Sequence, residues 1–328
     1  MQVEAIFRAL ADPTRLRILR LLGTMELAVG ELAQVLGQSQ PRVSRHVGIL
    51  CDAGLAERRR EGSWVFLRSV SANETGSLIS DGIAELLSEA ELEDAEFGAQ
   101  CKDDRKKLTA VRAARQKTAE DYFTRHASQW DELRSLHSPD GLVEQALLDL
   151  LGDQPLGRVL DIGTGTGRMA ELFAEHADHI VALDNSLEML RVARAKLQHL
   201  PAQKVELVQG DFTSLPFNKA SFDTILLHQV LHFAQEPQQA LAEAARVARG
   251  GAKIAIVDFA AHGHEDLREK HAHARLGFSD TQMEELLAAS GFEHSAEAVL
   301  DGGELTVKIW IGRRSGGAEK DQGKENSI

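Results

Sequence analysis

A glycine-rich loop after a short apolar strand is the part of this sequence best suited to holding a small ligand. It reads Asp161-Ile162-Gly163-Thr164-Gly165-Thr166-Gly167 and follows Val159-Leu160. Glycines let a backbone turn sharply and approach a ligand closely. A dinucleotide loop has the pattern G-x-G-x-x-G, which would put its third glycine at position 168, and that residue is Arg168. The alternating glycines after an acid therefore argue against a dinucleotide site.

This arrangement resembles the class I methyltransferases that depend on S-adenosylmethionine (SAM), in which the loop wraps the methionine part of the cofactor. Further motifs of that family recur in order along the chain, at Gly210-Asp211-Phe212, at His228–Phe233 and at Arg246–Gly251. The resemblance implies that SAM or its demethylated product S-adenosylhomocysteine (SAH) is the cofactor. It implies no metal.

The same resemblance assigns roles to individual side chains. Asp184 ends the strand after the loop and would take both ribose hydroxyls, since a carboxylate has two acceptor oxygens. Asp211 would bind the adenine amino group, Met189 would pack either on the adenine or in the core, and His228 would line the sulfonium side. The segment Tyr122–Trp130 lies where the family often has a lid helix, or it packs in the core. The predicted cofactor-binding residues are Asp161, Gly163, Gly165, Gly167, Asp184, Asn185, Met189, Asp211, Phe212, His228 and Tyr122.

A second motif, near the N-terminus, resembles the winged-helix repressors of the ArsR class. Ala9–Leu19 looks like the opening of that domain, and Gln38–Val47 is close to its recognition helix. Arginine and glutamine suit base edges in the major groove, serine suits phosphates, and wing arginines can reach flanking phosphates. The alternative is a solvated basic helix and hairpin. The predicted DNA-binding residues are Gln40, Arg42, Ser44, Arg45, His46, Arg59 and Arg60.

ArsR-type proteins usually bind double-stranded operator DNA as homodimers, with one subunit on each half-site. Ile6, Phe7 and Leu10, together with the apolar stripe Ile79–Leu87, are the predicted dimer surface, because such a narrow stripe on an exposed helix needs something to bury it.

The surrounding pattern predicts the elements that position these motifs. Residues 1–72 form short helices and a β-hairpin, residues 73–118 a helical connector, residues 119–312 the cofactor domain, and residues 313–328 a disordered tail. Strands alternate with helices in the cofactor domain, which indicates a parallel sheet covered on both faces. The predicted fold is α/β: a winged helix-turn-helix, a connector and a Rossmann-like, seven-stranded class I methyltransferase fold. The expected parallel strands are Arg158–Asp161, Ile180–Asp184, Val205–Gln209, Thr224–His228 and Lys253–Asp258.

Charge and cysteine content agree with this organisation. The net charge is −13, but residues 1–70 hold ten arginines against seven acidic residues, so a mildly basic head precedes an acidic body. The two cysteines, Cys51 and Cys101, exclude a disulfide framework and fit a reducing cytoplasm. We find no apolar run long enough for a membrane span and no secretory signal, so a cytoplasmic protein is expected.

Metal sensing at the usual ArsR position is not expected. The segment Glu26–Leu32 resembles the one in which that class carries paired cysteines, but Ala28 and Gly30 stand there, and neither can ligate a metal. Four histidines follow the fifth strand, at His262, His264, His271 and His273. They line the methyl-acceptor side of the pocket or are exposed to solvent, and a metal site is the weaker interpretation.

Two functions remain open from the sequence. The chain resembles SAH-responsive regulators of methionine-cycle genes, which join these same two domains, so one hypothesis is a repressor that binds SAH or SAM as effector. Ligand binding would then act on DNA binding through the connector helix. The alternative is an active SAM-dependent methyltransferase for an unidentified small molecule, with a regulatory DNA-binding head and with His228, His232 or His271 as a possible base.

Overall fold

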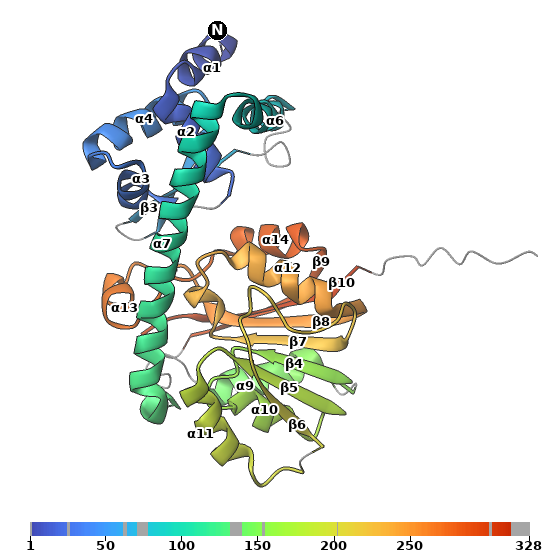
Figure 1. Cartoon of the computed structure of the whole chain (residues 1–328). Helices are drawn as coiled ribbons and strands as arrows, with labels where there is room; N and C mark the ends of the chain where they lie inside the picture. Colours follow the sequence, from blue (N-terminus) through green and yellow to red (C-terminus); the bar gives the residue numbers. More distant parts are fainter. Residues whose placement is uncertain are drawn as a thin grey trace, which may run out of the picture. The chain divides into compact units, whose positions relative to one another are not determined.

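The computed structural model describes residues 2–24, 27–61, 64–70, 78–131, 140–152, 155–201, 203–301 and 304–315. The chain forms two compact units. Unit 1 comprises residues 1–119 with 263–266, and unit 2 comprises residues 120–262 with 267–328. Figure 1 labels most helices and strands of both units.

Unit 1 contains a winged helix whose helix boundaries follow local signals. Asp12 caps α2, because its Oδ1 accepts a hydrogen bond from the backbone N–H of Arg15 at 3.1 Å. Gly37 ends α3 in the left-handed conformation. The wing is a hairpin of β2 and β3, with the short β1 paired to β3 on the other side. The elements are α1 (Gln2–Leu10), α2 (Pro13–Leu22), β1 (Leu27–Ala28), α3 (Val29–Leu36), α4 (Gln40–Asp52), β2 (Ala56–Glu61) and β3 (Trp64–Ser69).

Two further helices, α6 (Leu78–Glu93) and α7 (Ala95–His126), complete the core of unit 1. Leu87 of α6 and Leu108 and Val111 of α7 are buried in the same cluster as the winged-helix side chains. The prediction that the whole Ile79–Leu87 stripe faces a second subunit is therefore wrong for Leu87, which its own chain covers. Of this stripe, Ile79 and Leu86 stay exposed. Leu87 packs against side chains of α2 and α7, and the sequence pattern could not show which elements cover it.

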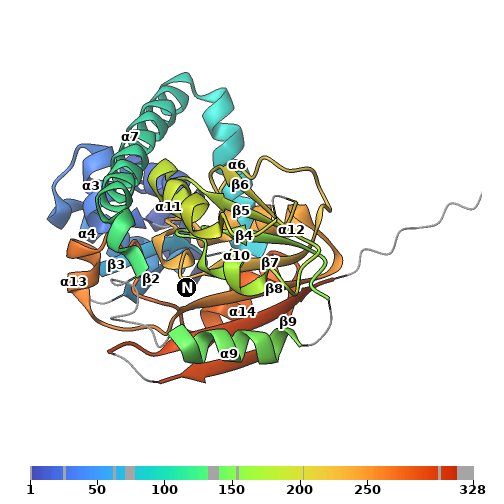
Figure 2. The ribbon, with the colours of Figure 1, turned by 90° about the horizontal axis from the view of Figure 1, so that it is seen from below.

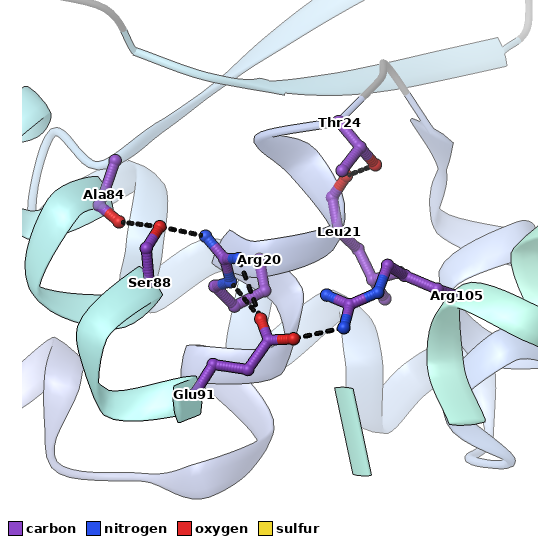
Figure 3. Close-up of polar contacts among 7 residues, drawn as sticks. All are labelled: Arg20, Leu21, Thr24, Ala84, Ser88, Glu91 and Arg105. Carbon is purple, nitrogen blue, oxygen red and sulfur yellow. Dashed lines mark hydrogen bonds and ion pairs between the residues drawn. The ribbon is translucent and has the colours of Figure 1, made fainter. Parts of the chain in front are cut away.

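Ion pairs reinforce this packing. Arg20 of α2 binds Glu91 through Nε at 3.0 Å and Nη2 at 2.8 Å and donates to Ser88 Oγ, and Glu91 also binds Arg105 of α7 (Figure 3). Two arginines hold the pKa of Glu91 at about 2. Separately, Arg17 binds Asp104 with two bonds, and the Asp104 side chain is only 2% exposed. Helices α6 and α7 are thus fixed to α2 by charge as well as by apolar contact.

Unit 2 is built on a seven-stranded sheet with the order β6-β5-β4-β7-β8-β10-β9. Strands β4 to β8 run parallel, and β10 is antiparallel to both of its neighbours. The predicted seven-stranded α/β fold is confirmed. The strands are β4 (Arg158–Ile162), β5 (His179–Asp184), β6 (Val205–Gln209), β7 (Phe222–His228), β8 (Ala248–Phe259), β9 (Phe292–Leu300) and β10 (Val307–Arg314).

Helices cover both faces of this sheet (Figure 1). The first face carries α9, α10 and α11, whose buried side chains share a cluster with Val159 and Ile180; α9 lies along β9 and β10 (Figure 2). The second face carries α12 and α14, around Phe222 and Trp310. None of the described helices is both long and apolar enough to cross a bilayer. The remaining helices are η1 (Ala127–Gln129), α9 (Asp140–Leu151), α10 (Arg168–Phe173), α11 (Leu187–Leu197), η2 (Leu231–Phe233), α12 (Pro237–Val247), α13 (Glu265–Lys270) and α14 (Asp280–Ala289).

Candidate cofactor site and DNA-binding surface

The glycine loop lies at the point where the strand order reverses, between the carboxyl ends of β4 and β7, which is where open α/β sheets bind ligands. Gly163, Gly165 and Gly167 have φ values of 70°, 54° and 83°, in the left-handed region that favours glycine. A Cβ on Gly163 would overlap the side chain of Val230, which follows β7. The loop therefore needs glycine for its conformation and for its close contact with the neighbouring strand.

Asp161, the acid before the loop, is 1% exposed. Its Oδ2 accepts a hydrogen bond from Thr164 Oγ1 at 2.5 Å, whereas Oδ1 has no hydrogen-bond partner among the residues that the structure describes. Burial, with repulsion from Asp184 adding to it, raises the pKa of Asp161 to about 7, although the Thr164 hydroxyl and the backbone N–H of Ala170 act in the opposite direction. A buried acceptor of this kind calls for a donor, and a cationic one in particular.

Asp184 at the end of β5 holds the loop from the other side. Its Oδ2 accepts the N–H of Gly165 and its Oδ1 accepts the N–H of Ser186, each at 2.8 Å. Burial raises the pKa of this carboxyl, and the backbone donors act in the opposite direction. Two oxygens with about four lone-pair sites leave acceptor capacity for hydroxyl donors, as predicted for a ribose.

Most of the other predicted cofactor residues lie at or just after the ends of the parallel strands, and Met189 lies on α11. Asp211 follows β6, and its Oδ1 accepts hydrogen bonds from the backbone N–H and the hydroxyl of Thr213, two residues further along the chain. Met189 on α11 is 1% exposed. Phe212 packs partly buried against the core. Asn185 follows Asp184 directly, and His228 is the last residue of β7.

Tyr122 is buried, and its hydroxyl lies 2.7 Å from His271 Nδ1. Burial raises the pKa of this phenol. Its ring contacts Trp130 edge to face, and Phe123, the next residue, packs in the same way on Trp130 and on Phe233 after β7. The segment predicted as a lid or as packing is therefore an aromatic cluster beside the site.

Sequence reasoning missed Asp131 and Asp258, and it named His232 only as a possible base. Asp131 accepts from Thr166 Oγ1 at 2.6 Å and from Lys196 Nζ at 3.0 Å. Asp258 on β8 is fully buried and binds the equally buried His232, with Nδ1 to Oδ1 at 2.8 Å. An acid near the end of the fifth parallel strand was a usable signal for Asp258. Asp131 had none, because its partners lie far away in sequence.

The histidines after β8 do not gather as a metal site in the part of the chain described here. His273 stacks on His232 with ring centroids 4.2 Å apart, and His271 binds Tyr122. Two of the four histidines thus lie in the aromatic cluster on the side of β7 and β8.

The residues of the site suit SAM or SAH. The unpartnered Asp161 oxygen suits the amino group that both molecules carry, the glycine cradle admits a ligand close to the backbone, and Asp184 suits hydroxyl donors. No part of this arrangement depends on a pyrophosphate.

The face of α4 that is predicted to bind DNA is exposed. Val43, Val47 and Leu50 point into the core, and Gln40, Arg42, Ser44 and Arg45 lie exposed on the other faces. His46 differs from these four, because its side chain is 12% exposed and lies 3.6 Å from Asp12. That contact favours a role for His46 in holding α4 against the start of α2.

The wing carries Arg58, Arg59 and Arg60 on β2, where the hairpin pairs Arg58 with Leu67. Arg58 is exposed; the side chains of Arg59 and Arg60 lie outside the described part of the structure. The mildly basic surface expected from the sequence is thus present at Arg42, Arg45 and Arg58.

Family models match both units. The model described as "Bacterial regulatory protein, arsR family" matches residues 12–58, and the model described as "Methyltransferase domain" matches residues 160–256. The first range spans α2 to the wing, and the second spans β4 to β8.

Two curated relatives each match part of the chain. A demethylmenaquinone methyltransferase of Renibacterium salmoninarum is 37% identical over 34% of this chain and 46% of its own length. A malonyl-[acyl-carrier protein] O-methyltransferase of Herminiimonas arsenicoxydans is 32% identical over 52% of this chain and 65% of its own length. The chain thus spans less than two thirds of either relative. A chain of the solved complex between the Haloferax volcanii Trm112 methyltransferase activator and a methyltransferase is 18% identical, with a TM-score of 0.50, and the match covers 59% of this chain and 97% of that one. That likeness concerns the fold alone.

Proposed function

We propose that this chain, in which an ArsR-family helix-turn-helix domain precedes a domain of the class I methyltransferase fold, is a DNA-binding repressor with SAH or SAM as its effector. Its targets would be genes of the methionine and SAM cycle. The observation that carries the proposal is the buried Asp161 carboxyl, which offers an unpartnered oxygen beside a glycine cradle on the same chain as an exposed, basic recognition helix.

The proposed effector site replaces the metal site of the ArsR class. Ala28 and Gly30, which stand in place of cysteines, offer no ligand atom in their side chains. Ala28 instead is the N-cap residue of α3, and its N–H donates to Glu31 Oε2 at 2.9 Å. A repressor without a metal switch needs another signal, and the second unit supplies a small-molecule site.

A homodimer on two half-sites is part of the proposal. Apolar side chains are left exposed on α1, with Val3 at 55% and Phe7 at 69%, and on α6, with Ile79 at 48% and Leu86 at 59%. Ile6, named with them at first, is buried in its own unit. Exposed apolar side chains of this size on two helices favour burial against a second copy.

The test is fluorescence anisotropy of labelled DNA from the gene's own upstream region, titrated with protein alone, with SAH and with SAM. We expect one ligand to change the DNA affinity at least tenfold, equivalent to about 1.4 kcal/mol of coupling. Asp184→Ala, which removes the carboxylate that organises the loop, should abolish the ligand effect and leave unliganded DNA binding intact. DNA affinity that is the same with and without either ligand would contradict the proposal.

A second candidate function is methyl transfer to a small molecule, which the His232–Asp258 pair favours. Asp258 engages Nδ1 of His232, so Nε2 carries the lone pair that can accept a proton. The curated relatives are named as methyltransferases. Incubation with labelled SAM and a panel of phenols, amines and thiols tests this candidate. Transfer that is lost in His232→Gln would support it; no transfer, together with tighter binding of SAH than of SAM, would support the effector role.

A further inference from the structure

Gln229, the residue that follows β7, is a buried amide whose donor is not satisfied by the described part of the chain. The residue is 5% exposed. Its Nε2 is shielded from solvent and has no hydrogen-bond partner among the residues that the structure describes. A buried donor without an acceptor costs free energy, so native proteins contain few of them, and each one calls for an explanation.

The backbone of Gln229 is strained as well. Its φ is 51°, in the left-handed region that side chains other than those of asparagine, aspartate and histidine rarely enter. A hydrogen bond from its N–H to the carbonyl oxygen of Val257 on β8, at 2.7 Å, holds this conformation. Strained residues of this kind cluster at ligand-binding sites, where the surrounding structure fixes them. An unpaired amide and a strained backbone thus mark the same residue.

The strand register places Gln229 beside the start of the glycine loop. Strands β4 and β7 are parallel neighbours, and Ile162, the last residue of β4, pairs with Leu227, two residues before Gln229. Val230, the next residue, lies so close to Gly163 that a Cβ on this glycine would overlap it. Gln229 therefore lies at the carboxyl edge of the sheet, where the loop leaves β4.

Asp161 and Gln229 have opposite hydrogen-bonding needs on these two neighbouring strands. Asp161 Oδ1 is a buried acceptor and Gln229 Nε2 a buried donor, and neither has a partner among the described residues. An α-amino-acid group carries a cationic donor and an anionic acceptor on the same carbon, so one such group can satisfy both. SAH and SAM end in this group. The nucleoside 5′-methylthioadenosine shares their adenosine and sulfur but offers neither charge.

We propose that Gln229 is a specificity-determining residue of the effector site, whose side-chain N–H donates to the carboxylate of SAH or SAM while Asp161 binds the amino group. The inference rests on the proposed function and names the residue that selects ligands with an amino-acid end. Selection of this kind is strong when the site contains a buried polar group, because a ligand that lacks the matching group leaves it unpaired.

Isothermal titration with SAH and with 5′-methylthioadenosine tests the role of Gln229. Gln229→Met keeps the length of the side chain and removes its amide. We expect this variant to bind SAH about tenfold more weakly than the wild-type protein and 5′-methylthioadenosine within about twofold, since only SAH loses a hydrogen bond to a charged group. The matched control is Gln238→Met, at an exposed position on α12, which should bind both ligands as the wild-type protein does. Unchanged SAH affinity in Gln229→Met, or an equal loss for both ligands, would overturn the inference.

Thermal denaturation of the ligand-free protein separates recognition from a structural role. Because Gln229→Met removes a buried donor that has no partner, its Tm should equal or exceed that of the wild-type protein. A lower Tm together with the same weakening for SAH and 5′-methylthioadenosine would assign Gln229 to the fold and overturn its role in recognition.

The inference and the proposed function fail in different ways. If the wild-type protein binds SAH but DNA affinity does not respond to SAH or SAM, the repressor proposal fails, and the two affinities of Gln229→Met still decide the role of this residue. If DNA affinity responds and Gln229→Met keeps the wild-type ratio of the two affinities, the repressor stands and the inference is wrong. A wild-type protein that does not bind SAH would overturn both.

Discussion

Replacing Asp161 with asparagine should make the ligand-free protein more stable at pH 8 and at the same time weaken its binding of SAH. Substituting a buried carboxylate usually destabilises a protein because it leaves the carboxylate's partners without a hydrogen bond. Asp161 differs, because its Oδ1 has no partner among the described residues. A pKa raised from 3.8 to about 7 means that folding with an ionised Asp161 costs roughly 4 kcal/mol. That cost is fully present above pH 7 and disappears as the pH falls towards 3.8, because the folded state then binds the proton more tightly than the unfolded state.

The ligand should reverse this cost. The amino group of SAH is a cationic donor, so it binds the ionised form of Asp161 and lowers its pKa in the complex. With a pKa of about 7 in the free protein, about 9% of Asp161 is ionised at pH 6 and about 91% at pH 8. SAH affinity should therefore fall about tenfold from pH 8 to pH 6.

Isothermal titration with SAH at pH 6, 7 and 8, together with thermal denaturation of the free protein, measures both effects. Asp161→Asn should bind SAH at least tenfold more weakly than the wild-type protein at pH 8, and its SAH affinity should not depend on pH between 6 and 8. Its Tm at pH 8 should be higher than that of the wild-type protein, and this difference in Tm should shrink towards pH 5. Asp149→Asn, at an exposed position on α9, is the matched control. Equal SAH affinity of the wild-type protein at pH 6 and pH 8, or a lower Tm of Asp161→Asn at pH 8, would refute the reasoning.

Three other predictions follow from unit 1. Arg17→Gln leaves the buried Asp104 without its two hydrogen bonds and should lower the free energy of unfolding, measured in urea, by about 3 kcal/mol. The control Arg8→Gln removes an exposed pair with Glu4 and should change that free energy by less than about 0.5 kcal/mol. Equal effects of the two variants would contradict a stabilising role of the buried Arg17–Asp104 pair. Arg45→Ala should weaken DNA binding and reduce the slope of log K against log salt by about one, and an unchanged slope would exclude a phosphate contact. Phe7→Glu places a charge on the exposed face of α1 and should halve the mass measured by light scattering. An unchanged mass would show that this face is not the dimer surface.

The elements of the cofactor domain could be predicted because their signals are local. The parallel strands other than β6 contain short apolar runs, and Gly163, Gly165 and Gly167 all occupy left-handed conformations that other residues avoid. Asp184 ends β5 and Asp211 follows β6, so both acids lie at the carboxyl ends of neighbouring parallel strands, as the strand pattern indicated. Local patterns of this kind determine which residues reach the site.

Contacts between distant segments could not be predicted. The periodicity of α6 shows that Leu87 needs cover, but nothing in its sequence distinguishes cover by α2 and α7 from cover by a second subunit. His46 lies on α4 among the residues predicted to bind DNA, and nothing in the local pattern indicates its contact with Asp12. Asp131 accepts hydrogen bonds from Thr166 and Lys196, which lie 35 and 65 residues away in the sequence.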